Sequence, residues 1–253
     1  MDTRAPTFGN PAPWGYFATV AWVAFAFVFS TAVAVVYSYW FFGYDQLRTM
    51  VESGDDLNAK FDGVLIANIT ILSAIVQIAI VAVAIQIRRW TIPDYLGLTL
   101  PPRHVIVQTV VLLIALLVLM EGLTLAFGYN TVPPFQVISY RTAKAAGGLL
   151  PLFAAVVVFA PVAEEIVFRG FLYRGFVRKP GHEPYAIFII TLVWMAVHQQ
   201  YDWVGLLQIF IIGLLFGWVR WSTGSIGLTM LLHMVANLFA SLETVVWVEW
   251  FLD

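Results

Sequence analysis

The sequence predicts an all-α, polytopic membrane protein that forms one bundle of seven or eight transmembrane helices. Of its 253 residues, 61% are hydrophobic and only 11% are charged, whereas charged residues make up about 25% of a typical soluble domain. The apolar residues form long runs, as spans require, since a transmembrane helix needs about 20 of them. Because little of the chain remains outside these runs, we expect a single membrane domain over residues 1–253.

Three spans are expected in the N-terminal half. The polar segment 1–14 has no signal-peptide cleavage site, so the first apolar run is expected to be retained as a span. The polar segment 45–62 should connect the first two spans, and prolines and arginines between 88 and 103 mark a loop before the third. The expected spans cover residues 16–42, 63–87 and 105–127. The charge of the third span, Glu121, is interpreted as a partly exposed or paired carboxylate near the end of its helix.

The C-terminal half is expected to add four or five helices. A loop over 128–146 precedes the fourth span, which begins at Gly147 and runs to about Phe176. The fifth, sixth and seventh spans are expected over residues 184–198, 203–221 and 225–239. Residues 242–251 form either a short eighth span or an interfacial helix.

The distribution of charge bears on orientation and on partners. With a cytoplasmic N-terminus, nine of the thirteen Lys and Arg residues fall on the cytoplasmic side, as the positive-inside rule favours. A net charge of −2 provides no basic surface for nucleic acid. The absence of cysteine excludes disulfides and thiolate chemistry. We therefore expect a multi-pass integral membrane protein whose surroundings are the lipid bilayer, with no nucleic-acid partner.

Two adjacent glutamates lie in the fourth span. Residues 148–162 carry no charge, so a helix would bring Glu164 and Glu165 to membrane depth, where an unpaired carboxylate costs about 3 kcal/mol or more. Arg169 follows Glu165 by four residues and can pair with it along the helix. Glu164 points about 100° away from Glu165. It therefore needs a different partner.

Two histidines close or interrupt later apolar runs. His198 lies four residues after Trp194, and Asn237 lies four residues after His233, so each pair projects from one face of its helix. Each side chain alone could be polar packing between helices. Together with Glu164, however, these groups supply a base, an acid or water-orienting group, and neutral donors for an oxyanion. The pattern indicates a hydrolytic site.

Helix rise predicts that these groups are not level in straight, upright helices. Measured from Arg169, Ser225 and Pro184 as the cytoplasmic ends, the depths of Glu164, His233 and His198 are about 8, 10 and 20 Å. A tilted fourth helix, or a fifth helix that starts outside the membrane, would bring them together.

These residues resemble the three motifs of the type II CAAX prenyl endopeptidases and their bacterial and archaeal relatives, the CPBP or Abi family of intramembrane proteases. Residues 164–169 resemble the family's E-E-x-x-x-R, 194–198 its F-x-x-x-H, and 233–237 its H-x-x-x-N or D. The order and spacing agree, and the resemblance covers a catalytic core at about 148–242. Trp194 replaces the usual phenylalanine and keeps an aromatic side chain.

The resemblance implies hydrolysis of a peptide bond in a membrane-anchored protein or peptide, with CAAX-type prenylated proteins among the substrates. It implies that the catalytic residues are Glu164, His198, His233 and Asn237. The first two would activate a water and the last two would hold the oxyanion. Structural support would come from Glu165, Arg169 and Trp194.

The resemblance leaves the cofactor open. The family has been described both as metalloproteases and as glutamate proteases that need no metal. Glu164 with His198 and His233 would make an acceptable zinc site. The expectation is therefore either no cofactor or one zinc ion.

Other chemistries fit the sequence less well. The H-E-x-x-H zinc motif needs a second histidine, which residues 182–186 lack. Ser225 is better explained as a helix N-cap than as the nucleophile of a serine protease. The alternative to a protease is a non-catalytic membrane scaffold or immunity factor, or a transporter, because buried charges also mark ion paths. Against transport, the two halves of the chain show no internal repeat.

Overall fold

The computed structural model describes residues 12–43 and 61–252, and all regular secondary structure in these residues is helical. Six helices in this part of the chain are long and apolar enough to cross a membrane, and we treat the protein as an integral membrane protein. They are α1 (Tyr16–Phe42), α4 (Gly63–Ile87), α6 (Arg103–Ala126), the continuous run Leu149–Phe176, α12 (Trp203–Thr223) and α13 (Ile226–Trp250). The expected connection 45–62 and the N-terminal segment lie largely outside the described residues.

The expected count of seven or eight spans is not confirmed. The segments predicted over 225–239 and 242–251 form one helix, α13, because no glycine or proline interrupts the chain after Gly227. Ser241, at the expected break, donates its hydroxyl to the Asn237 carbonyl one turn earlier and continues the helix. The predicted fifth span is the 14-residue helix α11 (Glu183–Ala196), which is too short to be counted among the six.

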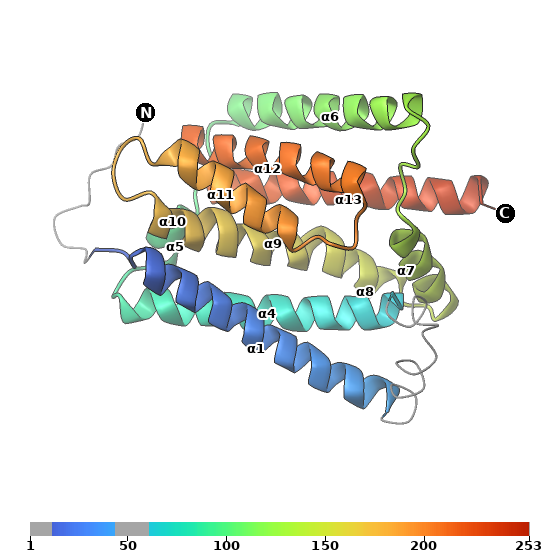
Figure 1. Cartoon of the computed structure of the whole chain (residues 1–253), viewed down its shortest axis with the longest axis horizontal. Helices are drawn as coiled ribbons and strands as arrows, with labels where there is room; N and C mark the ends of the chain where they lie inside the picture. The colour runs from blue at the N-terminus through green and yellow to red at the C-terminus, as the bar shows by residue number, and fades with distance from the viewer. Residues whose placement is uncertain (1–11, 44–60, 253) are drawn as a thin grey trace.

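The run Leu149–Phe176 is the central helix of the bundle. It consists of α8 (Leu149–Ala154), the π-helix η1 (Ala155–Phe159), α9 (Ala160–Glu165), the π-helix η2 (Ile166–Leu172) and α10 (Tyr173–Phe176). About 39% of its apolar stretch is buried, compared with 22–28% for the other five spans. It contacts α4 on one side and α13 on the other, as Figure 1 shows with the yellow helix between cyan and red.

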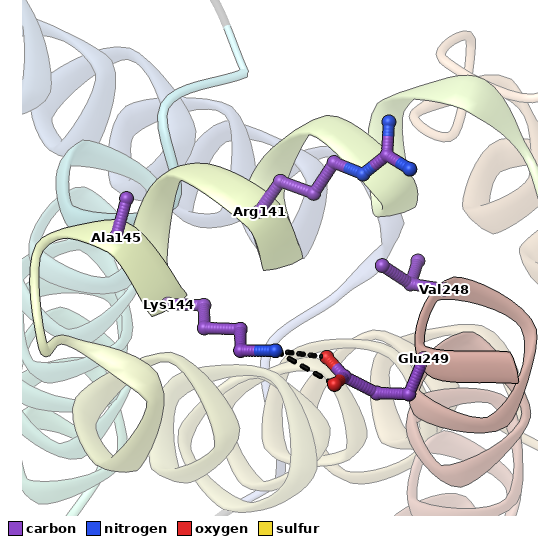
Figure 2. Close-up of a pocket in the computed structure, with 5 residues that line it drawn as sticks. All are labelled: Arg141, Lys144, Ala145, Val248 and Glu249. Atoms are coloured by element: carbon purple, nitrogen blue, oxygen red, sulfur yellow. Dashed lines mark hydrogen bonds and ion pairs between the residues drawn. The ribbon is translucent and has the colours of Figure 1, made fainter. Parts of the chain in front are cut away.

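The segment predicted as a loop over 128–146 contains a helix, α7 (Pro134–Ala145). Ser139 donates its hydroxyl to the carbonyl of Phe61, and Thr142 accepts the backbone N–H of Gly63, so α7 is joined to the start of α4. On its other side Lys144 Nζ lies 2.5 Å from Glu249 Oε1 (Figure 2). Proline at the first helical turn fits this position because its missing N–H has no partner there.

Tyr140 of α7 also donates to Glu249, over 2.8 Å. Burial, and then the hydrogen bond to Glu249, raise the pKa of the Tyr140 phenol to about 12. The phenol therefore stays protonated at physiological pH and continues to donate to α13.

The connection between α4 and α6 folds onto the start of α13. It contains the short helix α5 (Ile92–Leu96), which ends at Gly97 with φ of 76°. The carbonyl of Gly97 accepts the Ile226 N–H, and Ser225 donates its hydroxyl to the carbonyl of Thr99. A Cβ at Gly97 would lie 2.6 Å from the Gly224 carbonyl oxygen, so this close approach requires glycine.

Candidate active site

The end of α11 brings His198 to the level of Glu164. The central helix continues past Arg169 to Phe176, so Glu164 lies twelve residues, or roughly 18 Å, from that end of the helix. Because α11 has 14 residues, its C-terminal end lies at a similar depth, about 21 Å from its start. The mismatch expected from the sequence came from placing the end of the fourth helix at Arg169.

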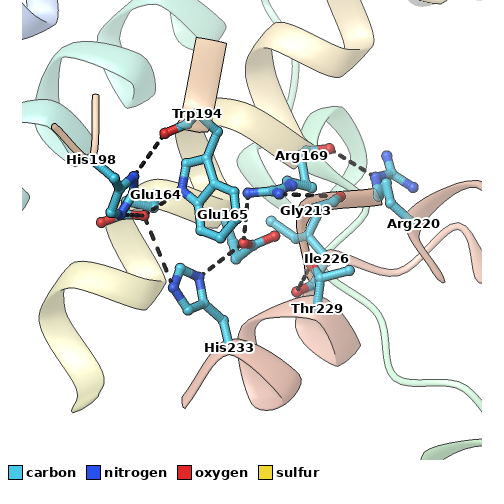
Figure 3. Close-up of polar contacts among 10 residues, drawn as sticks. All are labelled: Glu164, Glu165, Arg169, Trp194, His198, Gly213, Arg220, Ile226, Thr229 and His233. Carbon is cyan, nitrogen blue, oxygen red and sulfur yellow. Dashed lines mark hydrogen bonds and ion pairs between the residues drawn. The ribbon is translucent and has the colours of Figure 1, made fainter. Parts of the chain in front are cut away.

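Glu164 is held by a tryptophan. Trp194 of α11 donates its indole N–H to Glu164 Oε2 over 2.6 Å (Figure 3). Gly213 of α12 leaves room for this indole, because an added Cβ would lie 3.0 Å from its ring. The Glu164 side chain keeps 24% of its surface exposed. Its carboxylate is therefore oriented and still accessible.

Two imidazoles face the same carboxylate oxygen. The distance from Glu164 Oε2 is 3.9 Å to His198 Nε2 and 4.0 Å to His233 Nε2. His198 Nδ1 lies 2.7 Å from the Trp194 carbonyl, which can only accept, so Nδ1 carries the proton. In the neutral tautomer this leaves the His198 Nε2 lone pair directed toward Glu164.

Glu165 forms a separate, buried ion pair. Its Oε1 lies 3.1 Å from Arg169 Nη1 and 3.0 Å from His233 Nδ1. Glu165 is fully buried and Arg169 is 2% exposed. The Arg169 guanidinium also lies over the Trp194 ring, 4.3 Å from its centroid. This geometry agrees with the expected i, i+4 pair and adds His233, which the sequence did not connect to Glu165.

The side chain of Asn237 is hydrogen-bonded to the central helix. Its amide Nδ2 donates to the Val156 carbonyl over 2.7 Å. Val156 belongs to η1, in which each N–H bonds five residues back, as Ala160 does to Ala155. The next donor in that register would be Pro161, which has no N–H. Asn237 thus supplies a hydrogen bond that the sequence of the π-helix lacks.

Tyr201 is a site neighbour that sequence reasoning missed. Its ring centroid lies 6.2 Å from that of His198, and its hydroxyl accepts from Gln136 of α7 over 3.2 Å. Burial raises the pKa of the Tyr201 phenol. The hydrogen bond from Gln136 lowers this pKa, and the negative charge of Glu164 raises it further. A tyrosine three residues after His198, in a short polar connection, was the signal available in the sequence.

Arg220 was not predicted as a site residue, and the sequence counts it only among the nine Lys and Arg residues on the cytoplasmic side. It is buried, and its Nε donates to the Arg169 carbonyl over 2.9 Å while Nη2 donates to the Leu96 carbonyl over 3.2 Å. Among the described residues it forms no ion pair. These two hydrogen bonds join α12 to η2 and to α5, directly behind the Glu165 ion pair.

The spacing around Glu164 does not fit a zinc ion. Carboxylate and imidazole are suitable zinc ligands, but ligands about 2.0 Å from a tetrahedral metal lie only about 3.3 Å from one another. The Glu164 to histidine distances are 3.9 and 4.0 Å. In the described part of the chain, no three or more His, Cys, Asp or Glu side chains are arranged to hold a metal ion.

Comparison with known proteins identifies the segment that carries this site. Residues 146–239 match the model of the family described as "Type II CAAX prenyl endopeptidase Rce1-like". Neither the curated proteins nor the solved structures give a match. The matched segment contains the central helix, α11, α12 and the half of α13 that holds His233 and Asn237. Over this segment the chain is similar to the Rce1-like type II CAAX prenyl endopeptidases.

Proposed function

We propose that the protein is an intramembrane endopeptidase that hydrolyses a peptide bond of a membrane-anchored substrate with a water activated by Glu164 and His198. The observation that carries the proposal is the approach of two imidazole Nε2 atoms to one accessible carboxylate oxygen within the membrane-spanning bundle. The family match over the same residues supports it.

The spacing suits one bridging water. Two hydrogen bonds of about 2.8 Å that meet at a right angle join atoms about 4 Å apart. The distances from Glu164 Oε2 to the two Nε2 atoms, 3.9 and 4.0 Å, have this value. A water between them would contact the carboxylate and both rings.

A count of protons assigns different roles to the two histidines. A water has two hydrogens, whereas Glu164 Oε2 and two neutral Nε2 atoms are three acceptors. One ring must therefore carry a proton on Nε2. His233 is the better carrier because its Nδ1 faces the Glu165 carboxylate, 3.0 Å away, whereas His198 Nδ1 faces only a neutral carbonyl. The water then donates to Glu164 and His198 and accepts from His233.

In the reaction, the water oxygen forms a bond to the substrate carbonyl carbon while Glu164 takes one of its protons. The His233 Nε2–H moves its hydrogen bond from the water to the carbonyl oxygen and stabilises the negative charge that develops there. Glu164 then passes its proton to the amide nitrogen as the carbon–nitrogen bond breaks. Asn237 holds η1 in place beside the site, and its second N–H is a further donor for the oxyanion. Glu165 and Arg169 keep His233 in position.

The test compares two carboxylate variants in purified protein. The probes are a quenched fluorescent peptide ending in a prenylated cysteine and three further residues, and a second peptide with a transmembrane anchor and no prenyl group. Glu164→Gln should lower the cleavage rate by at least about 100-fold, as expected for loss of a general base. Glu121→Gln, which changes another carboxylate within a span, should not.

Equal cleavage by the wild type and Glu164→Gln would contradict the proposal. If the wild type cleaves neither peptide, the result would favour the alternative that the protein is a scaffold, an immunity factor or a transporter. Cleavage of the prenylated probe alone would assign the substrate to the CAAX class, and cleavage of both would assign the specificity to the membrane anchor.

We also propose that the N-terminus is cytoplasmic. Figure 1 places α7 and the connection between α10 and α11 at opposite ends of the bundle. With no native cysteine in the chain, Lys179→Cys should react with an impermeant thiol reagent only from the cytoplasmic side and Lys144→Cys only from the other side. The reverse pattern would overturn the orientation, and labelling of both from one side would overturn the helix arrangement.

A further inference from the structure

A pocket opens beside Glu164, between α4 and α9. Its volume is about 210 Å³, and its wall includes Glu164, Ala160 and three polar residues of α4, namely Thr70, Ser73 and Gln77. The polar residues follow one another at intervals of three and four, so they share one face of α4. Helix α4 lies outside the segment that matches the family. The pocket therefore joins the shared site to a surface contributed by the rest of the chain.

The hydroxyls of this face are unsatisfied within the described part of the chain, unlike several others in the spans. Ser38, Thr109 and Thr124 each donate to a carbonyl one turn earlier in their own helix, which is the usual way to satisfy a hydroxyl in a helix. In the described residues, Thr70 and Ser73 make no hydrogen bond. Gln77 donates to Ser30 of α1 over 3.1 Å, which fixes its amide at the end of the face. Two donors thus remain available inside the bundle next to Glu164.

A peptide that is cleaved within a membrane needs hydrogen-bonding groups of this kind. Its backbone must be extended at the scissile bond, so the N–H and C=O groups lose their helical partners, and hydrocarbon supplies no replacement. From Thr70 to Gln77 the helix rises about 10 Å, which is the length of about three residues of extended chain. The face therefore has both the groups and the length that a short extended segment needs.

The opposite wall of the pocket is small and apolar. Ala160 and Ala163 of α9 present only methyl groups there, and Ala74 of α4 adds a third methyl group on the side of the hydroxyls. Beside the two hydroxyls they leave a recess for a side chain.

We propose that this face of α4 is a substrate-binding site: it holds about three residues of extended substrate main chain on one side of the scissile bond, with a substrate side chain in the alanine-lined recess. The inference rests on the proposed function, since it takes Glu164 as the group that activates the water. Thr70 and Ser73 are binding residues in this account, and they take no part in proton transfer.

Kinetics with the peptide that the protein cleaves give the first test. The double variant Thr70→Val, Ser73→Ala removes both hydroxyls at nearly constant volume. Loss of two hydrogen bonds should raise KM by about tenfold or more, with a smaller change in kcat. Thr109→Val is the matched control because its hydroxyl is satisfied within α6. An unchanged KM in the double variant, with cleavage still dependent on Glu164, would overturn the binding site and leave the protease standing.

Cross-linking gives a test that does not depend on turnover. In the Glu164→Gln background, Ser73→Cys should form a disulfide under mild oxidation with probe peptides that carry a cysteine at one of three successive positions on one side of the scissile bond. Ile75→Cys is the control, since it lies on the same helix at similar depth and is 53% exposed on the outer surface. Equal cross-linking at both positions, or none at Ser73→Cys, would contradict the proposal.

Discussion

The surroundings of Glu164 and Glu165 differ although the two residues are adjacent in the sequence. Glu165 is fully buried and is neutralised by Arg169 within one helical turn. Glu164 remains partly exposed, contacts an indole N–H, and faces two imidazoles at about 4 Å. A rotation of about 100° between consecutive residues is enough to direct one carboxylate into the packed interior and the other into an accessible site.

In this way a membrane protein can keep one carboxylate accessible next to a buried one. The buried pair supplies a fixed frame, because Glu165 orients His233 and Arg169 lies against the Trp194 ring. On the accessible side, the same tryptophan donates a hydrogen bond to Glu164 and the same histidine faces the Glu164 carboxylate. We call Glu165 and Arg169 the buried layer, and Glu164 with the groups that face it the accessible layer. Removing a residue from the buried layer should lower mainly stability, and removing one from the accessible layer should lower mainly activity.

The largest effect on stability is expected for Arg169→Ala. It leaves the fully buried Glu165 carboxylate without its cation, which typically costs about 3–5 kcal/mol. Thermal unfolding in detergent should show a clear fall in melting temperature, whereas Lys144→Ala, which removes an exposed ion pair of α7, should cause little change. Equal melting of the two variants would mean that the Glu165 pair is solvated.

Asn237→Asp should show an intermediate effect that depends on pH. An ionised aspartate cannot donate to the Val156 carbonyl, so the variant should be less active by about tenfold or more at neutral pH. Protonation restores one donor, and activity should therefore rise as the pH falls. The wild-type rate measured over the same range is the control. A variant as active as the wild type at neutral pH would show that the contact with η1 is dispensable.

The smallest effect is expected for Trp194→Phe. The phenyl ring can still lie against Arg169, but it lacks the N–H that donates to Glu164. We expect a fall in kcat of several-fold with only a modest change in melting temperature, since one hydrogen bond to a charged group is lost from an accessible position. A large fall in melting temperature with unchanged kcat would place Trp194 in the buried layer alone.

The sequence predicted the parts of the site that follow from helical periodicity. The pairing of Glu165 with Arg169 and the shared face of Trp194 and His198 are consequences of a turn of 3.6 residues. Five of the spans were also located to within a few residues, because long apolar runs leave little freedom.

What the sequence did not predict depends on contacts between distant segments. The two π-helical stretches widen the central helix beside Glu164, and the hydrogen bond from Asn237 to Val156 joins residues 81 positions apart. The helix α7 has a polar, mixed composition without an apolar run, and its Gln136 and Phe135 contact Tyr201 beside the site. The burial of Arg220 was not predicted, because charge alone does not reveal its backbone carbonyl partners.

The division of roles between the two glutamates is tested most directly by measuring cleavage rate and melting temperature for both amide variants in the same preparation. Glu164→Gln should abolish cleavage and leave the melting temperature unchanged or higher, because it removes the base together with a charge at membrane depth. Glu165→Gln should lower the melting temperature, because Arg169 is left buried without its anion. Retained cleavage by Glu164→Gln, or melting of Glu165→Gln at the wild-type temperature, would contradict this account.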